Sequence, residues 1–316
     1  MASTHNLFKT FNDTIKLTEA KKDELRISRD AIRDDIKSWL FDNGKGGSSF
    51  RLQGSFAMNT TVNPINGDEF DIDDGLYLDG YKDSDEITWP MASTVHDWVV
   101  SAVSGRTSKA PTNKQACVRI SYGHGYHVDV PIYIERNGRA YLANTADGWI
   151  ESDAGGFVGW LNDKNSVADG QLKRIVRYLK RWKDHREVPL RGIELTILAA
   201  KNYSGANGRD DDAMRYTAER IASVLKISFS CVKPVASWED LFDGASVTKK
   251  RAILDELDFL VAELRAAADA SDQERASEHL RKVFGDDFPK GDPPSKAAGY
   301  VATSSPAVLK HDGRSG

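Results

Sequence analysis

Apolar and polar residues alternate in four short segments in the first half of the chain, and this period of two is typical of half-buried β-strands. The segments are residues 50–53, 69–78, 117–122 and 127–134. The last two flank Gly123-His124-Gly125, so we expect them to form a hairpin. A further short strand is predicted at residues 141–143.

Helical periodicity dominates the second half, where apolar residues return every three or four positions. It predicts helices at residues 169–185, 191–203, 211–226, 248–270 and 273–284, after earlier helices at 18–41 and 89–103. Stretches near residues 151–168 and 205–211 are predicted to be linkers. The fold class is therefore α+β, with a mixed sheet and flanking helices followed by an α-helical lobe.

This change in pattern predicts a bilobal chain with a tail. The sheet lobe is expected at residues 1–165, the helical lobe at 166–289 and a flexible tail at 290–316. The N-terminal helices can cross over to pack on the helical lobe, which makes the border between the lobes soft. The tail is rich in Gly, Pro, Ser and Ala and has no periodic apolar residues, so it should be mobile.

Two aspartates in the strand predicted at residues 69–78 provide the first candidate chemistry. Asp71 and Asp73 are two residues apart, so they project from one face, while Phe70 and Ile72 point into the core. Two like charges on one face repel each other unless a cation lies between them, and Mg²⁺ is the usual cation for such oxygen ligands. A lone pair of this kind is more often a solvated surface feature, so the rest of the pattern decides.

A third carboxylate, Asp129, lies in the next buried strand. Val128 and Val130 share one side of that strand, which leaves Asp129 to face a cleft. Pro131 follows and indicates an edge or an irregular point of the sheet. Three aspartates on two apolar strands are typical of sites in which two divalent cations activate an attacking hydroxyl and stabilise a leaving phosphate oxygen. We therefore expect a nucleotidyltransferase, with these aspartates as catalytic residues and metal ligands.

The Gly54-Ser55 pair, upstream of the aspartates, is the candidate phosphate-binding turn. Gly54 has no side chain and lets the backbone approach a phosphate closely, while Ser55 offers a hydroxyl and an N–H. Alone, the pair would be a turn with a helix cap. Its position before Asp71 favours phosphate binding.

A basic stripe on the helix predicted at residues 169–185 is the second candidate anion site. Lys173, Arg177 and Lys180 recur at helical spacing and could bind triphosphate oxygens. A solvated charged face explains the stripe about equally well.

Composition excludes several classes of protein. The chain has 316 residues, 40% hydrophobic and 28% charged, and a net charge of −4, which argues against a protein that coats nucleic acid. The sequence contains no apolar run of about 18 residues, so no membrane span is predicted. The first residues lack the apolar core of a signal peptide, and we therefore expect a cytoplasmic protein. The two cysteines, Cys117 and Cys231, are predicted to be free thiols.

These motifs resemble the nucleotidyltransferase superfamily that includes DNA polymerase beta, and more narrowly the bacterial cGAS/DncV-like nucleotidyltransferases (CD-NTases), the signal synthases of antiphage CBASS systems. The resemblance covers roughly residues 5 to 290. It is carried by Gly54-Ser55-Phe56, Asp71-Ile72-Asp73-Asp74-Gly75, Val128-Asp129-Val130-Pro131, Arg181-Trp182-Lys183-Asp184 and Phe284-Gly285-Asp286-Asp287-Phe288-Pro289.

The resemblance implies a polymerase-beta-like fold and an enzyme that condenses nucleoside triphosphates, ATP or GTP among them, into a cyclic di- or trinucleotide second messenger. It implies two Mg²⁺ ions, with Mn²⁺ as an alternative, a triphosphate on Gly54 and Ser55, and a triphosphate-binding lysine best matched by Lys173, with Arg177 beside it. A separate effector would receive the product. In some relatives conjugation enzymes of the ubiquitin-like kind (E1/E2-like) attach the C-terminal residue to targets, which makes Gly316 a candidate for conjugation.

Three other functions share part of the pattern. An enzyme that tails RNA or makes linear oligonucleotides would use the same catalytic strands, but would need a groove for a long polyanion. A non-catalytic binding module is disfavoured because all three aspartates are present. A modifier of small molecules, of the antibiotic-adenylating kind, is the weakest alternative.

Overall fold

The alternating segments form an eight-stranded mixed sheet in the computed structural model, which describes residues 3–65, 69–123 and 125–293. The strand order is β3-β4-β5-β2-β6-β7-β8, and β1 pairs with β2. The strands are β1 (Ser49–Gln53), β2 (Phe70–Tyr77), β3 (Thr112–Asn113), β4 (Val118–Tyr122), β5 (Tyr126–Val130), β6 (Ile132–Arg136), β7 (Arg139–Asn144) and β8 (Gly148–Glu151).

The centre of the sheet is β2, which is parallel to both β5 and β6 and antiparallel to β1. Pro131 separates β5 from β6, and its carbonyl accepts a hydrogen bond from the Leu76 amide at 2.9 Å. The predicted irregular point and the predicted β4–β5 hairpin are both present, although His124 lies outside the described residues. The short strands β3 and β8 were not predicted.

Ten helices complete the part of the chain that the structure describes. They are α1 (His5–Ile15), α2 (Glu19–Asp42), α3 (Gly54–Ala57), α4 (Ala92–Ala102), α5 (Ala154–Val167), α6 (Gln171–His185), α7 (Gly192–Asn202), α8 (Asp210–Ile227), α9 (Val247–Asp269) and α10 (Gln273–Phe284). The mixed sheet, flanking helices and helical lobe confirm the predicted fold class. None of the helices within the described ranges has the length and apolar character needed to cross a membrane.

One predicted linker is wrong, because α5 occupies most of residues 151–168. The first six residues of the helix, AGGFVG, include three glycines, which lower its helix propensity. The sequence therefore favoured a linker over a helix here. Packing overrides that propensity, since Phe157 and Leu161 are buried. The Asp153 side chain caps the helix by accepting a hydrogen bond from the Gly156 amide at 2.7 Å.

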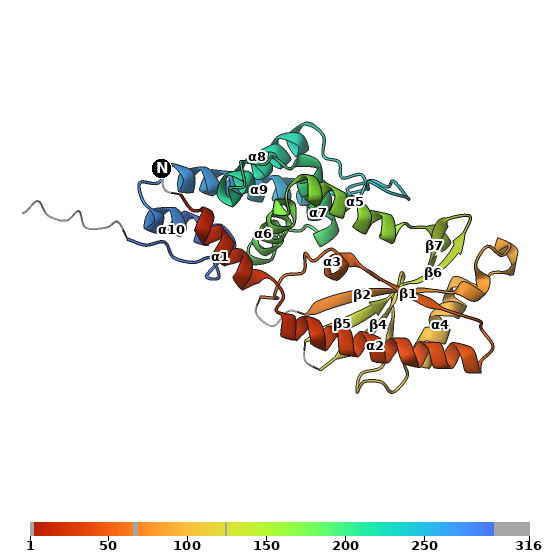
Figure 1. Ribbon diagram of the computed structural model, residues 1–316. Coiled ribbons are helices and arrows are strands. Elements are labelled where there is room, and N and C mark those ends of the chain that lie inside the picture. Colours follow the sequence, from red (N-terminus) through yellow and green to blue (C-terminus); the bar gives the residue numbers. More distant parts are fainter. Residues whose placement is uncertain (1–2, 66–68, 124, 294–316) are drawn as a thin grey trace, which may run out of the picture.

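Two hydrophobic clusters form the core. One joins the sheet to α2 and α4, and the other joins α5–α10 to α1 (Figure 1). Ile15 at the end of α1 belongs to the helical cluster, whereas Leu17 belongs to the sheet cluster. The chain therefore crosses between the lobes at Lys16. The predicted border at residues 165/166 lies in the last turn of α5, which packs with the helical cluster.

Candidate active site

The strand register brings the three predicted catalytic aspartates to one face of the sheet. Asp71 and Asp73 project from the same face of β2, and Asp73 lies beside Asp129 in the parallel pair with β5. Register partners in a parallel pair point to the same side. The three carboxylates therefore share one surface, as the alternation predicts.

Crowding of like charges dominates the electrostatics of this face. Burial, followed by the nearby charges of Asp71 and Asp129, raises the pKa of Asp73 to about 8. Asp71 makes no hydrogen bond to any other described residue. Among the described residues, no lysine or arginine lies within ion-pairing distance of Asp71 or Asp73.

Asp129, unlike Asp71 and Asp73, forms an ion pair with an arginine, Arg119 on the neighbouring strand β4. The guanidinium donates two hydrogen bonds to the carboxylate, at 2.7 Å from Nε and 2.6 Å from Nη2. His127, two residues earlier, forms a 2.9 Å hydrogen bond through Nδ1 with Glu69. Its buried Nε2 has no hydrogen-bond partner among the described residues and lies 4.0 Å from Asp71 and 3.9 Å from Asp129.

The donor set fits hard divalent cations. Three carboxylates offer oxygen ligands, which are the ligands Mg²⁺ prefers. Within the described ranges, no three His, Cys, Asp or Glu side chains are placed so that they could hold one metal ion together. The carboxylate of Asp129 is hydrogen-bonded to Arg119 instead, whereas those of Asp71 and Asp73 are free of such a partner among the described residues.

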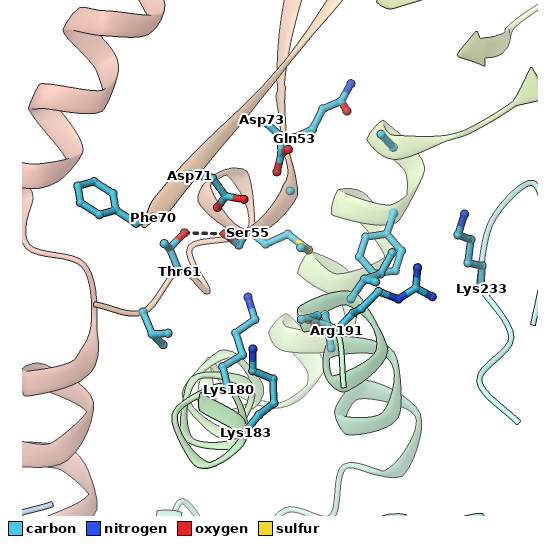
Figure 2. Close-up of a pocket in the computed structure, with 18 of the residues that line it drawn as sticks. Gln53, Ser55, Thr61, Phe70, Asp71, Asp73, Lys180, Lys183, Arg191 and Lys233 are labelled. Atoms are coloured by element: carbon cyan, nitrogen blue, oxygen red, sulfur yellow. Dashed lines mark hydrogen bonds between the residues drawn. The ribbon is translucent and has the colours of Figure 1, made fainter. Parts of the chain in front are cut away.

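Gly54 is required by the carboxylate beside it. Its φ is +62°, and a Cβ added there would lie 1.8 Å from Oδ2 of Asp73. Ser55 follows in the short helix α3, and its hydroxyl hydrogen-bonds the Thr61 hydroxyl at 2.8 Å (Figure 2). The predicted phosphate-binding turn therefore lies directly against the aspartates.

A cavity of about 760 Å³ opens between this face of the sheet and the helical lobe. That volume suits a ligand of nucleotide size. The sheet lobe contributes Gly54, Ser55, Asp71 and Asp73, and the helical lobe contributes a set of cations opposite them: Lys180, Lys183, Arg191 and Lys233 (Figure 2). The sheet wall of the cavity thus carries carboxylates, while the helical wall carries these cations together with Asp184.

Lys180 is the most deeply placed of these cations. Burial lowers its pKa to about 8, while the charge of Asp71 acts in the opposite direction. Its ammonium donates to the carbonyl oxygen of Thr60 at 3.1 Å and to the hydroxyl at 3.2 Å. Among the described residues no carboxylate lies within ion-pairing distance of it.

The structure places two predicted phosphate-binding residues away from the cavity. Lys173 donates to Oδ1 of Asn162 on α5 at 2.7 Å. Arg177 is 7% exposed and donates to Oδ1 of Asn12 and to the Asn59 carbonyl, at 2.8 and 2.6 Å. Neither lines the cavity, because only the C-terminal half of α6 faces it.

The helix predicted to carry the basic stripe does border the cavity, but at a later turn than Lys173 and Arg177. Lys180, the third member of the predicted stripe, lines the cavity, and so does Lys183, which was not predicted as a site residue. Arg191 and Lys233 were also missed, because their approach depends on how the helical lobe packs against the sheet. Gly316 and the rest of the tail from residue 294 lie outside the described residues.

Comparison with known proteins agrees with this geometry. Residues 48–133 match the family model of the cyclic GMP-AMP synthase DncV-like nucleotidyltransferase domain. The cyclic GMP-AMP synthase of Escherichia coli is 23% identical over 296 residues, covering 75% of this chain and 67% of that protein. The CBASS oligonucleotide cyclase CdnC of Escherichia coli strain KTE188 is 22% identical over 205 residues, covering 63% of this chain and 65% of that protein.

Solved structures show the same fold over a larger share of the chain. Vibrio cholerae DncV cyclic AMP-GMP synthase superposes with a TM-score of 0.76 at 19% identity, covering 92% of this chain and 98% of that chain. A complex of that synthase with the linear intermediate 5′ pppA(3′,5′)pG superposes with a TM-score of 0.75.

The chain therefore has the fold of DncV, and its residues 48–133 are similar to a nucleotidyltransferase domain. The two curated relatives are matched over about two thirds of their length. These comparisons show similarity to the DncV-like nucleotidyltransferases.

Proposed function

We propose that this enzyme condenses nucleoside triphosphates into a cyclic di- or trinucleotide that serves as a CBASS signal, with release of pyrophosphate. The observation that carries the proposal is that Asp71 and Asp73, which have no lysine or arginine partner among the described residues, face Lys180 and Lys183 across one cavity. A nucleoside triphosphate presents both a site for metal ions and several anionic oxygens, so it complements both walls. The curated relatives are named as cyclases, which favours cyclisation over RNA tailing.

The residues divide the work as follows. Asp71, Asp73 and Asp129 would hold two Mg²⁺ ions. When bound, these ions would neutralise phosphate charge and lower the pKa of the attacking ribose hydroxyl. Lys180 and Lys183 bind the β- and γ-phosphates, while the Gly54-Ser55 turn brings its backbone against them.

The reaction is an in-line displacement at the α-phosphorus. The ribose oxygen of one nucleotide forms a bond to the α-phosphorus of a second, and the bond to the bridging oxygen of pyrophosphate breaks. The hydroxyl proton passes to solvent. For a cyclic dinucleotide, a second displacement within the linear intermediate closes the ring and releases a second pyrophosphate; a cyclic trinucleotide takes one further condensation, with a third pyrophosphate, before the ring closes.

The cellular setting follows from this activity. We propose a bacterial cytoplasmic enzyme whose product is received by a separate effector protein. Conjugation of Gly316 by ubiquitin-like conjugation enzymes remains a proposal on the C-terminal tail. Mass spectrometry after co-expression with such enzymes would detect an adduct that requires Gly316, and its absence would count against this part.

Product analysis tests the activity directly. The protein is incubated with the four triphosphates and Mg²⁺ but no RNA, and products are separated and weighed by mass spectrometry. The expected result is a cyclic oligonucleotide together with pyrophosphate. Products that form only when RNA is added, and that remain attached to it, would overturn the proposal in favour of a tailing enzyme.

A further inference from the structure

Three neighbouring basic side chains of α6 bond the backbone of residues 59–63, the segment after α3, whose neighbour Met58 packs in the helical cluster. Arg177 Nη1 donates to the Asn59 carbonyl at 2.6 Å, and Arg181 Nη2 donates to the Asn63 carbonyl at 2.8 Å. Lys180 lies between them on the helix and bonds the Thr60 carbonyl at 3.1 Å. Positions i, i+3 and i+4 share one helical face, so all three reach the same segment, residues 59–63.

These side chains are buried although their partners on the segment are neutral. Arg177 and Lys180 are each 7% exposed and Arg181 is 2% exposed. Burial lowers the pKa of both arginines, which reflects the cost of keeping their charge away from water. Arg181 also lies 3.2 Å from Asp287. Apolar side chains could fill this space without the desolvation cost of a buried charge. What the basic side chains add is therefore their hydrogen bonds to residues 59–63.

The segment is in turn bonded to the phosphate-binding turn. The Met58 amide donates to the Gly54 carbonyl at 3.2 Å, and the Thr60 amide donates to the Ser55 carbonyl at 2.9 Å. The side chains of Ser55 and Thr61 are linked at 2.8 Å. A continuous series of hydrogen bonds therefore runs from α6 through residues 58–63 to Gly54 and Ser55.

We infer that α6 acts as a clasp between the lobes, and that Arg177 and Arg181 are positioning residues for the Gly54-Ser55 turn. The clasp fixes the distance between this turn, on the sheet lobe, and the lysines of α6, on the helical lobe. Both groups are then pre-organised for a single triphosphate, and binding need not draw the lobes together. The role of the turn rests on the function proposed above, whereas the clasp itself does not.

Hydrogen exchange and steady-state kinetics test the clasp together in the full-length protein. In Arg177→Ala without nucleotide, the amides of Met58, Asn59 and Thr60 should exchange about tenfold faster, because the segment loses a charge-assisted hydrogen bond. The KM for the triphosphates should rise about tenfold, with a much smaller change in kcat. Arg177→Lys, which keeps the charge and one hydrogen bond, should recover part of both losses.

The matched control is Arg186→Ala, at the end of the same helix. Arg186 pairs with Glu256 at 2.9 Å, within the helical lobe. Its loss should leave both the exchange of residues 58–60 and the KM unchanged. Arg181→Ala is the second test variant, and circular dichroism identifies any variant that fails to fold.

The outcomes separate the clasp from the proposed function. If folded Arg177→Ala and Arg181→Ala keep the exchange rates and the KM of the native protein, the clasp is overturned. Faster exchange throughout the helical lobe, rather than in residues 58–60, would show a merely structural role and would also overturn it. If the native protein binds no triphosphate, the proposed function fails, while exchange in nucleotide-free protein still decides the clasp.

Discussion

Adjacent aspartates on β2 have opposite environments on the two faces of the sheet. Asp74 is 1% exposed and accepts two hydrogen bonds at 2.6 Å from Arg33 of α2. Asp73 faces the cavity beside two other carboxylates, and its pKa is raised to about 8. The two residues have the same chemistry and the same strand, so only the face distinguishes them.

The difference lies in whether the fold itself supplies the counter-charge. On the α2 face, Arg33 satisfies Asp74 fully and the pair joins the helix to the sheet. On the cavity face, Asp71 and Asp73 are left for ligands that come from solution. The pairing of Asp74 is therefore structural, whereas the charges of Asp71 and Asp73 stay available for a cation from solution.

The largest expected effect comes from removing the unpaired charges. Asp71→Asn combined with Asp73→Asn should lower pyrophosphate release by at least about a thousandfold, because the metal ligands are lost. The thermal unfolding temperature should stay the same or rise, since repulsion is relieved. Activity assays and calorimetry on the same preparation check both halves. Retention of activity in the double variant would refute the catalytic assignment.

The paired aspartate should respond in the opposite way. Asp74→Ala leaves Arg33 without its partner and should cost about 2–3 kcal/mol of stability, at the low end for a buried pair because Arg33 is 21% exposed. The folded fraction should keep its activity. Urea unfolding measures the loss, and Arg26→Ala, from an exposed pair on the same helix, is the control with little effect. An equal loss in both variants would contradict the comparison.

The pH dependence of stability sharpens the contrast further. Because the pKa of Asp73 is higher in the folded protein than its ordinary value near 3.9, the folded state holds this proton more tightly. The metal-free protein should therefore lose stability as pH rises from about 4 to about 8. Asp73→Asn should flatten this slope by about 1 kcal/mol per pH unit near pH 7. Parallel slopes for the two proteins, measured with a chelator present, would disprove it.

Arg119 provides the intermediate case and the smallest effect. It gives Asp129 a counter-charge that a metal ion must displace. Arg119→Gln should therefore lower the Mg²⁺ concentration needed for half-maximal thermal stabilisation by about threefold, the size expected of a partly exposed pair. Weaker Mg²⁺ binding in this variant would mean that Arg119 orients Asp129 for the metal instead of competing with it.

Period and residue type were enough to predict the carboxylate face. Alternation along β2 placed Asp71 and Asp73 together, and the apolar neighbours of Asp129 gave its orientation. These features are local, since a strand fixes its faces by itself. Similarly, the apolar period of α6 predicted its bounds closely.

What the sequence left undetermined depends on contacts between the lobes. The period of α6 does not say which end of the helix meets the sheet, so Lys173 was preferred over Lys180 as the triphosphate-binding lysine. The helix α5 was missed because tertiary packing of Phe157 and Leu161 outweighs its glycines. The partner of Asp74 was equally hidden, because Arg33 is 41 residues away in sequence.

The position of α1 has a consequence for biosynthesis. Its Phe8 ring packs against Phe284 and Phe288, with ring centres 5.8 and 5.1 Å apart, so the first helix completes its packing only against the last. At about 5–20 residues per second on the ribosome, those partners emerge tens of seconds later. During that interval the sheet and α2 can already assemble, while the phenylalanine side chains of α1 stay exposed to solvent. Chaperones that hold apolar N-terminal segments are therefore expected to engage this chain during its synthesis.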